Sequence, residues 1–251
     1  YKEGSSWNEI SNDIIVNKAS ETYNYKYCNL TSEIKSFYPV RNSKGVKTIT
    51  PQGTLMQWQN PSMVWTDENG SVISSVNSVS DLKGDVTTNS LTYSSVFNGI
   101  DARFTQRSFS RELDYIINNL SAISEKPSNA KYLLFLENIT VPSGWYVEPH
   151  YVISNFNATD EIDKITISNE KGEIVAVLAC PYYYDSGNIN NPKHNAKGSY
   201  TLDANGSTVI VGIKVPIDWL ENYNRVYPVI IDPVTYYNYN ASQASGNVTC
   251  D

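Results

Sequence analysis

The chain has 251 residues, a formal net charge of −7 and only 18% charged residues, and this length is sufficient to bury a full hydrophobic core. It contains no Lys/Arg cluster of the kind that neutralises nucleic-acid phosphates, so we expect no nucleic-acid partner. The longest apolar run, residues 174–180, is far shorter than the roughly 20 residues that cross a bilayer, so we expect no membrane span.

Alternating apolar residues separated by turn residues predict β-strands along most of the chain. A central meander is expected, formed by residues 103–107, 113–117 and 131–137. Three hairpins are also expected, with turns at 67–70, 171–172 and 204–206, between residues 62–66 and 71–74, 164–168 and 173–179, and 199–203 and 207–215.

The strand at 209–215 places β-branched residues on one face, and Ile210 and Gly212 make its other face mostly apolar as well. This pattern predicts a strand covered on both sides. The helix signal is confined to residues 216–221, one short turn that begins with Pro216.

Strands spaced about 8–12 residues apart are typical of a sandwich rather than of βαβ units. We therefore predict an all-β protein, an antiparallel β-sandwich with extended terminal arms. The N-terminal arm is expected at 1–29, the sandwich domain at 30–235, and a C-terminal arm or linker at 236–251. A division of the domain into two lobes near 95–110 is left open.

The segment 219–233 reads WLENYNRVYPVIIDP, the segment 93–104 reads YSSVFNGIDARF, and residues 165–185 form a strand–turn–strand pattern that ends in Pro181 and Asp185. Together, over residues 63–233, they resemble an extracellular β-rich module of large bacterial and archaeal cell-surface proteins. In that family the module typically precedes Rhs-type, disaggregatase-related or adhesion-type repeats. The resemblance implies an extracellular, cell-surface location, more in keeping with an archaeal than another source, and it includes no catalytic signature.

Within the closing segment we expect Tyr227, Val229 and Ile231 to share one face of a strand, with Trp219 in the core beneath it. Proline cannot donate a ladder hydrogen bond. Pro228 therefore predicts a strand that starts late or lies at an edge.

Secretion is also indicated by N-x-S/T sequons, several of which fall at predicted turns where a glycan projects into solvent. We predict a glycoprotein that carries N-linked glycans at some of these positions: Asn29, Asn69, Asn119, Asn138, Asn157, Asn205, Asn240 and Asn247.

Three cysteines, Cys28, Cys180 and Cys250, match no metal or redox spacing. In an oxidising compartment we expect one disulfide and one remaining thiol. The alternative is that Cys28 and Cys180 are small buried apolar side chains.

Enzymatic chemistry has weak support, since the chain has two His and no nucleophile or phosphate-binding motif. Carboxylates could act in pairs, as in glycosidases, and the candidates are Asp101, Glu112, Asp114 and Asp232. Asp101 and Asp232 are better explained as turn residues, and His150 as an ordinary surface histidine. We expect no enzyme, no cofactor and no metal. Residues 185–190 offer three oxygen ligands at spacings loosely like a calcium loop, but no closing Glu follows them, so a plain polar loop is the better explanation.

Two functions remain. We predict a non-enzymatic structural subunit or module of a cell-surface assembly, such as a filament, sheath or S-layer-like coat. It would self-assemble with copies of itself, or join other surface-protein domains, by β-strand or arm exchange. The alternative is a carbohydrate-binding or adhesion module in which Trp145 and Tyr183 stack on sugar rings.

Overall fold

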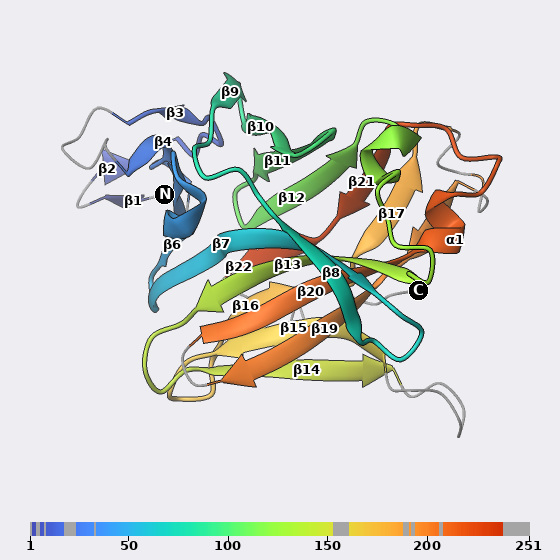
Figure 1. Cartoon of the computed structure of the whole chain (residues 1–251). Coiled ribbons are helices and arrows are strands. Elements are labelled where there is room, and N and C mark those ends of the chain that lie inside the picture. Colours follow the sequence, from blue (N-terminus) through green and yellow to red (C-terminus); the bar gives the residue numbers. More distant parts are fainter. Residues whose placement is uncertain are drawn as a thin grey trace.

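The computed structural model describes residues 2–3, 6–7, 9–17, 24–32, 34–152, 161–187, 191, 194–205 and 208–237. These residues form almost entirely antiparallel β-structure (Figure 1). Helical structure in these ranges is confined to α1 (Ile217–Leu220) and the 3-10 turns η2 (Asn42–Lys44) and η3 (Leu120–Ile123). No helix in these ranges has the length and apolar character needed to cross a membrane.

One layer of the fold is centred on the long strand β7. Its strands follow one another in the order β3 (Ile15–Val16), β4 (Tyr25–Asn29), β5 (Lys35–Pro39), β6 (Val46–Thr50), β7 (Gly53–Thr66), β13 (Tyr132–Thr140), β20 (Thr208–Pro216) and β19 (Ser199–Asn205). Strand β8 (Val72–Asn77) pairs with the second half of β7, beyond the end of β6.

The other layer is centred on β12. It runs through β9 (Gly84–Thr87), β10 (Ser90–Phe97), β11 (Ile100–Gln106) and β12 (Ser110–Ile117). The two halves of β12 then pair with β21 (Val229–Asp232) and β22 (Val234–Tyr237). Strand β21 continues to β17 (Tyr182–Asp185) and β18 (Asn195–Lys197), and β22 to β16 (Ile174–Leu178), β15 (Glu161–Ser168) and β14 (Tyr146–Val152).

The two layers pack face to face and are joined by backbone contacts at both sides. Strands β15 and β19 share one residue pair. At the other side the Ile14 N–H, next to β3, donates to the Thr88 carbonyl, next to β9, at 2.8 Å, and the Val79 N–H donates to the Val96 carbonyl on β10 at 3.0 Å.

Tyr115 on β12 stacks on Phe135 on β13 with ring centroids 4.2 Å apart, and Trp58 on β7 stacks on Tyr93 on β10 at 5.6 Å. These strands are not ladder partners, so the aromatic contacts lie between sheets. The predicted antiparallel β-sandwich is thereby confirmed. A separate small hairpin contains β1 (Lys2–Glu3) and β2 (Ser6–Trp7).

Strand β7 contains an irregularity that brings a polar side chain and an indole into the core together. Trp58 and Asn60 have positive φ angles of 55° and 46°, and the register with β13 shifts at this point. Bulges of this kind re-aim side chains. As a result Gln57 and Trp58 are both buried although they are adjacent in sequence, and the Trp58 indole donates to the Tyr115 hydroxyl at 2.9 Å.

The predicted hairpins are confirmed as β7–β8, β15–β16 and β19–β20, although residues 206–207 of the third turn lie outside the described residues. In the first turn the Asp67 carboxylate accepts from the backbone N–H groups of Asn69 and Ser71, and Gly70 has φ +80°. The helical turn that follows β20 is also confirmed, as α1.

The predicted meander is wrong in its third member. Strands β11 and β12 pair with each other, but β13 pairs with β7 and β20 in the other layer. The chain passes through η3 between β12 and β13 and changes sheet there. Apolar alternation predicts that each strand exists, but it holds no information about which strand lies beside it.

The outer face of strand β20 is only partly covered. Its inward residues are buried as expected, and Gly212 is buried as well, but Ile210 remains 38% exposed. A Cβ at position 212 would collide with Thr201 and Leu136 on the two neighbouring strands, which explains the glycine at this position. The prediction of complete cover is therefore wrong at Ile210.

The closing strand β21 begins directly after Pro228, so the predicted late start is confirmed. It is not an edge strand, because it pairs with both β12 and β17. Val229 and Ile231 are fully buried. Tyr227 precedes the strand, is half-buried, and donates to the backbone carbonyl of Leu220 at 3.0 Å. Trp219 is half-buried at the margin of the core.

The arm boundaries drawn from sequence do not coincide with the sheet. Strands β3 and β4 lie within the predicted arm 1–29 yet pair in the sheet, and the boundary at 29–30 falls inside the β4–β5 hairpin. Likewise β22 extends the sheet to Tyr237. The suggested split near 95–110 falls on β10–β12, which are hydrogen-bonded to one another. Residues 238–251 lie outside the described residues.

Candidate functional site

Three of the four carboxylates singled out from sequence meet on the outward face of the β12 layer. Strand β12 keeps one register with β21 and β22, in which Tyr115 pairs with Ile231 and Glu112 with Val234. This register places Asp114 directly opposite Asp232. Glu112 lies on the same face, two residues before Asp114 on β12.

Asp101 does not contribute to this group. Its carboxylate accepts hydrogen bonds from the Ser95 backbone N–H at 2.7 Å and from the Asn118 side chain at 3.1 Å. It therefore stabilises the β10–β11 connection, in agreement with its interpretation as a local hydrogen-bonding residue.

Two arginines neutralise two of the grouped carboxylates. The Arg103 guanidinium, opposite Asp114 across β11–β12, donates through Nε and Nη2 to Asp114 Oδ2 at 2.8 and 2.6 Å. Arg107 Nε donates to Glu112 at 2.6 Å. Burial nevertheless raises the pKa of Asp114 above its ordinary value, against the opposing effect of Arg103.

Asp232 has no such cation. Burial, followed by repulsion from Asp114 and Glu112, raises the pKa of Asp232 to about 7. Its Oδ1 atom is buried and has no hydrogen-bond partner among the described residues, so this oxygen does not cap a turn as predicted. A buried acceptor without a donor costs about 1–3 kcal/mol.

A second polar group, which sequence reasoning missed, lies between the sheets. Arg111 on β12 and Glu137 on β13 are 4% and 8% exposed, and both line an internal cavity of about 20 Å³. Arg111 donates to Thr48 Oγ1 at 2.5 Å and to Gln57 Oε1 at 2.6 Å. Burial raises the pKa of Glu137 to about 7, although the Arg111 charge opposes this shift.

This cavity has the size of one or two water molecules and is far smaller than sites for organic ligands. We therefore regard it as a buried polar cluster of the core. A sequence signal for it does exist, because Arg111 and Glu137 occupy inward positions of alternating strands in which the other inward residues are almost all apolar.

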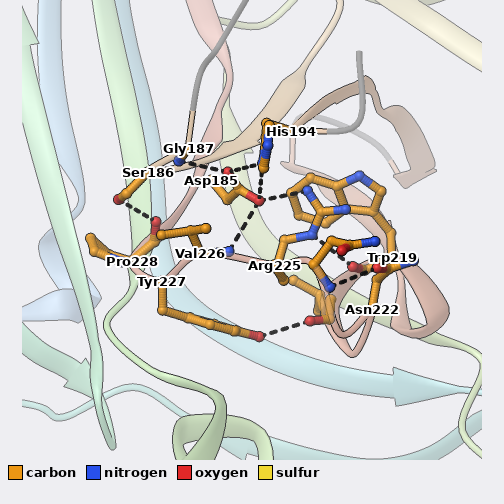
Figure 2. Close-up of polar contacts among 12 residues, drawn as sticks. Asp185, Ser186, Gly187, His194, Trp219, Asn222, Arg225, Val226, Tyr227 and Pro228 are labelled. Atoms are coloured by element: carbon orange, nitrogen blue, oxygen red, sulfur yellow. Dashed lines mark hydrogen bonds and ion pairs between the residues drawn. The ribbon is translucent and has the colours of Figure 1, made fainter. Parts of the chain in front are cut away.

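A third polar cluster surrounds Asp185 at the end of β17, and Figure 2 shows its side chains converging on this carboxylate. The Asp185 side chain is 0% exposed and that of Arg225 4% exposed. Arg225 Nη1 donates to Oδ2 at 2.8 Å, and His194 Nδ1 donates to Oδ1 at 2.8 Å. The backbone N–H groups of Gly187 and Val226 donate at 2.8 and 3.2 Å.

These donors reverse the usual effect of burial. Desolvation alone would raise the pKa of Asp185, but the hydrogen bonds from His194, Gly187 and Val226, together with the Arg225 charge, hold this pKa below its ordinary value. Arg225 also lies over the Trp219 ring, 3.7 Å from its centroid, and donates to the Trp219 carbonyl at 3.1 Å. The cluster thus fastens the segment that follows α1 to the end of β17.

The calcium-loop pattern at 185–190 has no support among the described residues. The Asp185 carboxylate is already occupied by four donors, and residues 188–190 lie outside the described residues. Within the described part of the chain, no group of three or more His, Cys, Asp or Glu side chains is arranged to hold a metal ion.

Of the two aromatic residues predicted to stack on sugars, Tyr183 is wrongly placed. It is 4% exposed and packs edge-on against Trp219, with ring centroids 4.6 Å apart. The β17 register turns Tyr182, which is 37% exposed, to the outside instead. Trp145 is half-buried against the core and lies close to Gly53, so its role as a sugar contact stays a prediction.

The predicted sequons fall into distinct environments. Asn69 and Asn119 are exposed and Asn138 is half-buried, while the side chains of Asn157, Asn205, Asn240 and Asn247 lie outside the described residues. Asn29 is fully buried, and its Nδ2 donates to the Ser11 and Asp13 carbonyls, both at 2.9 Å. The folded chain therefore leaves no room for a glycan at Asn29.

Cys28 and Cys180 are buried as small apolar side chains are, and His150 is an ordinary surface histidine. Cys28 is a buried free thiol, so no bridge joins it to Cys180, which is also buried, and Cys250 lies outside the described residues. Burial raises the pKa of the Cys28 thiol. His150 lies on the exposed strand β14 and contacts Thr166 Oγ1 at 3.1 Å.

The edges of the sheets differ in how they are protected. Strand β14 carries Glu148 and Pro149, while β3, β9 and β18 have four residues or fewer. Strand β8 has six residues and pairs only with β7 among the described strands. Residues 72–80, VISSVNSVS, contain no charge and no proline, and Val72, Val76 and Val79 are 67%, 42% and 46% exposed.

No protein-family model matches the chain, and no curated protein matches it. The resemblance to modules of cell-surface proteins therefore stays a prediction.

Proposed function

We propose that the chain is a non-enzymatic structural module of an extracellular cell-surface assembly, and that neighbouring subunits join it by β-strand pairing along β8. The observation that carries the proposal is the unprotected edge of β8. Natural sheets usually protect their edges with charge, proline or short strands, because an open edge pairs with other chains. Strand β8 has none of these devices, whereas the other edges described above have at least one.

A second copy of the chain fits this edge in an antiparallel arrangement. Pairing two β8 strands about Ser74 and Ser75 would place Val76 of one copy opposite Ile73 of the other. Such a contact is self-complementary, as a two-fold interface requires. The absence of charge from residues 72–80 matters because two copies that each carry −7 repel one another elsewhere.

Light scattering coupled to size-exclusion chromatography, over a protein concentration series, tests the proposal. We expect the wild-type mass to rise with concentration. Val76→Lys should raise the apparent dissociation constant at least about tenfold, which corresponds to about 1.4 kcal/mol. The matched control is Ile210→Lys, because Ile210 is similarly exposed but β20 is paired on both sides.

Circular dichroism should show that both variants keep the β-structure of the wild type. A wild-type protein that remains monomeric at every concentration would contradict the proposal. Equal weakening by Val76→Lys and Ile210→Lys would contradict it as well, because charge rather than the β8 edge would then be responsible.

A further inference from the structure

The chain contains three Asn-Gly dipeptides, which begin at Asn69, Asn98 and Asn205. An Asn side chain that precedes glycine can lose its amide without an enzyme, because no Cβ atom hinders the glycine nitrogen from reaching the side-chain carbonyl carbon. Asn69 and Asn205 also begin sequons, whereas Asn98 is followed by Gly99 and Ile100 and does not. An N-linked glycan would therefore protect Asn69 and Asn205, but never Asn98.

Asn98 lies in the tight turn of the β10–β11 hairpin. Phe97 and Ile100 are directly opposed, so Asn98 and Gly99 alone connect the two strands. Asn98 is exposed to water, and Gly99 has a φ angle of +72°. No described residue accepts a hydrogen bond from the Gly99 N–H. The nitrogen that would attack the Asn98 side chain is thus not held by a competing contact in the described structure.

The turn between β7 and β8 contains the same dipeptide but holds it in place. The Gly70 N–H donates to the Asp67 carbonyl at 3.2 Å. On either side of it, the backbone N–H groups of Asn69 and Ser71 donate to the Asp67 carboxylate at 2.9 and 2.8 Å. The Gly70 nitrogen would have to give up its hydrogen bond, and the turn would have to loosen, before this nitrogen could attack the Asn69 side chain.

We infer that Asn98 is a site of non-enzymatic deamidation in the folded chain, and that it reacts faster than Asn69. The Gly99 nitrogen loses its proton to solvent base and bonds to the Asn98 side-chain carbonyl carbon. The side-chain nitrogen takes up a proton from solvent and leaves as ammonia, which closes a succinimide ring. Water then adds to one of the two ring carbonyl carbons and opens the ring, so that position 98 becomes either aspartate or isoaspartate. No oxidant, reductant or cofactor is consumed.

The two products affect the hairpin differently. Aspartate adds one negative charge to a chain of net charge −7 and leaves the main chain intact. Isoaspartate carries the main chain through the former side chain and inserts one CH₂ group between Phe97 and Ile100, which are 2% and 0% exposed. The turn has little space for this insertion, since a Cβ at Gly99 would lie 2.8 Å from the Ala122 Cβ. Aged protein that contains isoaspartate should therefore melt at a lower temperature than Asn98→Asp.

Peptide mapping of the unglycosylated 251-residue chain, incubated at mildly alkaline pH, tests the inference. Trypsin separates the two sites, because Asn98 lies in the peptide 84–103 and Asn69 in the peptide 48–83. Mass spectrometry over time gives the rate of amide loss at each site, and electron-transfer fragmentation distinguishes isoaspartate from aspartate. We expect Asn98 to react at least about fivefold faster than Asn69, which corresponds to about 1 kcal/mol, the usual net value of one hydrogen bond.

Guanidinium chloride provides the first control, because the unfolded chain has neither turn and the two rates should become similar. Asp67→Ala provides the second, because it removes the carboxylate that holds the Asn69 turn. This variant should react faster at Asn69 and at an unchanged rate at Asn98, with wild-type β-structure by circular dichroism. Equal rates in the folded wild type, a difference that persists in guanidinium chloride, or an unchanged Asn69 rate in Asp67→Ala would each overturn the inference.

The inference does not depend on pairing along β8. Val76→Lys, which is designed to weaken that pairing, should show the same ratio of the two rates as the wild type. A ratio near one in Val76→Lys would mean that association of the chains, rather than the turn, protects Asn69, and it would overturn the inference.

Discussion

Asp185 and Asp232 lie at the ends of the neighbouring strands β17 and β21. Asp185 is buried and Asp232 is partly buried, yet their surroundings have opposite effects on their pKa values. Asp185 receives four donors, one of them the Arg225 cation, and its pKa is lowered. Asp232 faces Asp114, has an unpaired oxygen, and its pKa is raised to about 7. The comparison shows that burial alone does not decide the charge state of a carboxylate, because the number and charge of its donors do.

The same comparison separates satisfied from unsatisfied polar groups. The Asp185 cluster is satisfied internally and holds the segment after α1 against β17. Asp232 is not satisfied in this way, because its buried Oδ1 accepts no hydrogen bond from the described residues and therefore costs the fold free energy.

Asp185→Ala is expected to cause the largest effect. It leaves the Arg225 guanidinium, which is 4% exposed, buried without its counter-charge. Removing one member of a buried pair costs about 3–5 kcal/mol of unfolding free energy, measured by urea denaturation. Asp85→Ala, at an exposed position on β9, is the control and should change stability by less than about 0.5 kcal/mol. A loss below about 1 kcal/mol for Asp185→Ala would show that the cluster does not stabilise the fold.

The pH dependence of stability should separate the two acids by direction. The folded-state pKa of Asp232 is raised to about 7, above the unfolded-state value of about 4. The stability that Asp232 contributes is therefore fully present below about pH 4 and is lost as the pH rises to about 7. The slope is at most about 1.4 kcal/mol per pH unit. The pKa of Asp185 is lowered in the folded state. The stability that Asp185 contributes is therefore present above its unfolded-state pKa of about 4 and is lost as the pH falls below that value.

Glu137 has a pKa raised in the same direction as Asp232, so the wild-type curve alone does not isolate Asp232. The measurement is therefore the difference between wild-type and Asp232→Asn unfolding free energies at several pH values. We expect the unfolding free energy of Asp232→Asn to increase relative to that of the wild type as the pH rises from about 4 to about 7. Parallel curves over that interval would mean that Asp232 is ionised throughout.

His194→Ala should have the smallest effect. It removes one of the four donors to Asp185 and leaves the Arg225 contact intact, so a loss of about 1 kcal/mol is expected from thermal or urea unfolding. His150→Ala provides a matched control, because His150 is exposed and, among the described residues, its ring hydrogen-bonds to Thr166 Oγ1 rather than to a buried charge. Its effect should lie within about 0.5 kcal/mol. Equal effects of the two substitutions would indicate that His194 contributes nothing to the cluster.

The sequence predicts several of the residues that form the candidate site, but it does not predict which of them lie opposite one another. The sequence offers Glu112, Asp114 and Asp232 as candidate carboxylates, and Glu112 and Asp114 stand on one strand. The pairing of Asp114 with Asp232 joins residues more than 100 positions apart, and only the β12–β21 register establishes it. Arg111 and Glu137 were missed because a single charge in an apolar strand pattern does not show what lies opposite it.

The sequence by itself determined the all-β class, the three hairpins and the helical turn, because alternation and turn residues act over a few neighbouring positions. Only the tertiary structure decided that β13 leaves the β12 layer, that Tyr183 rather than Tyr182 faces inward, and that Asp185 is satisfied while Asp232 is not. The physical reason is that strand order, and the face a strand turns to the core, depend on contacts between distant segments. A shift of one residue in register exchanges every side chain between core and solvent.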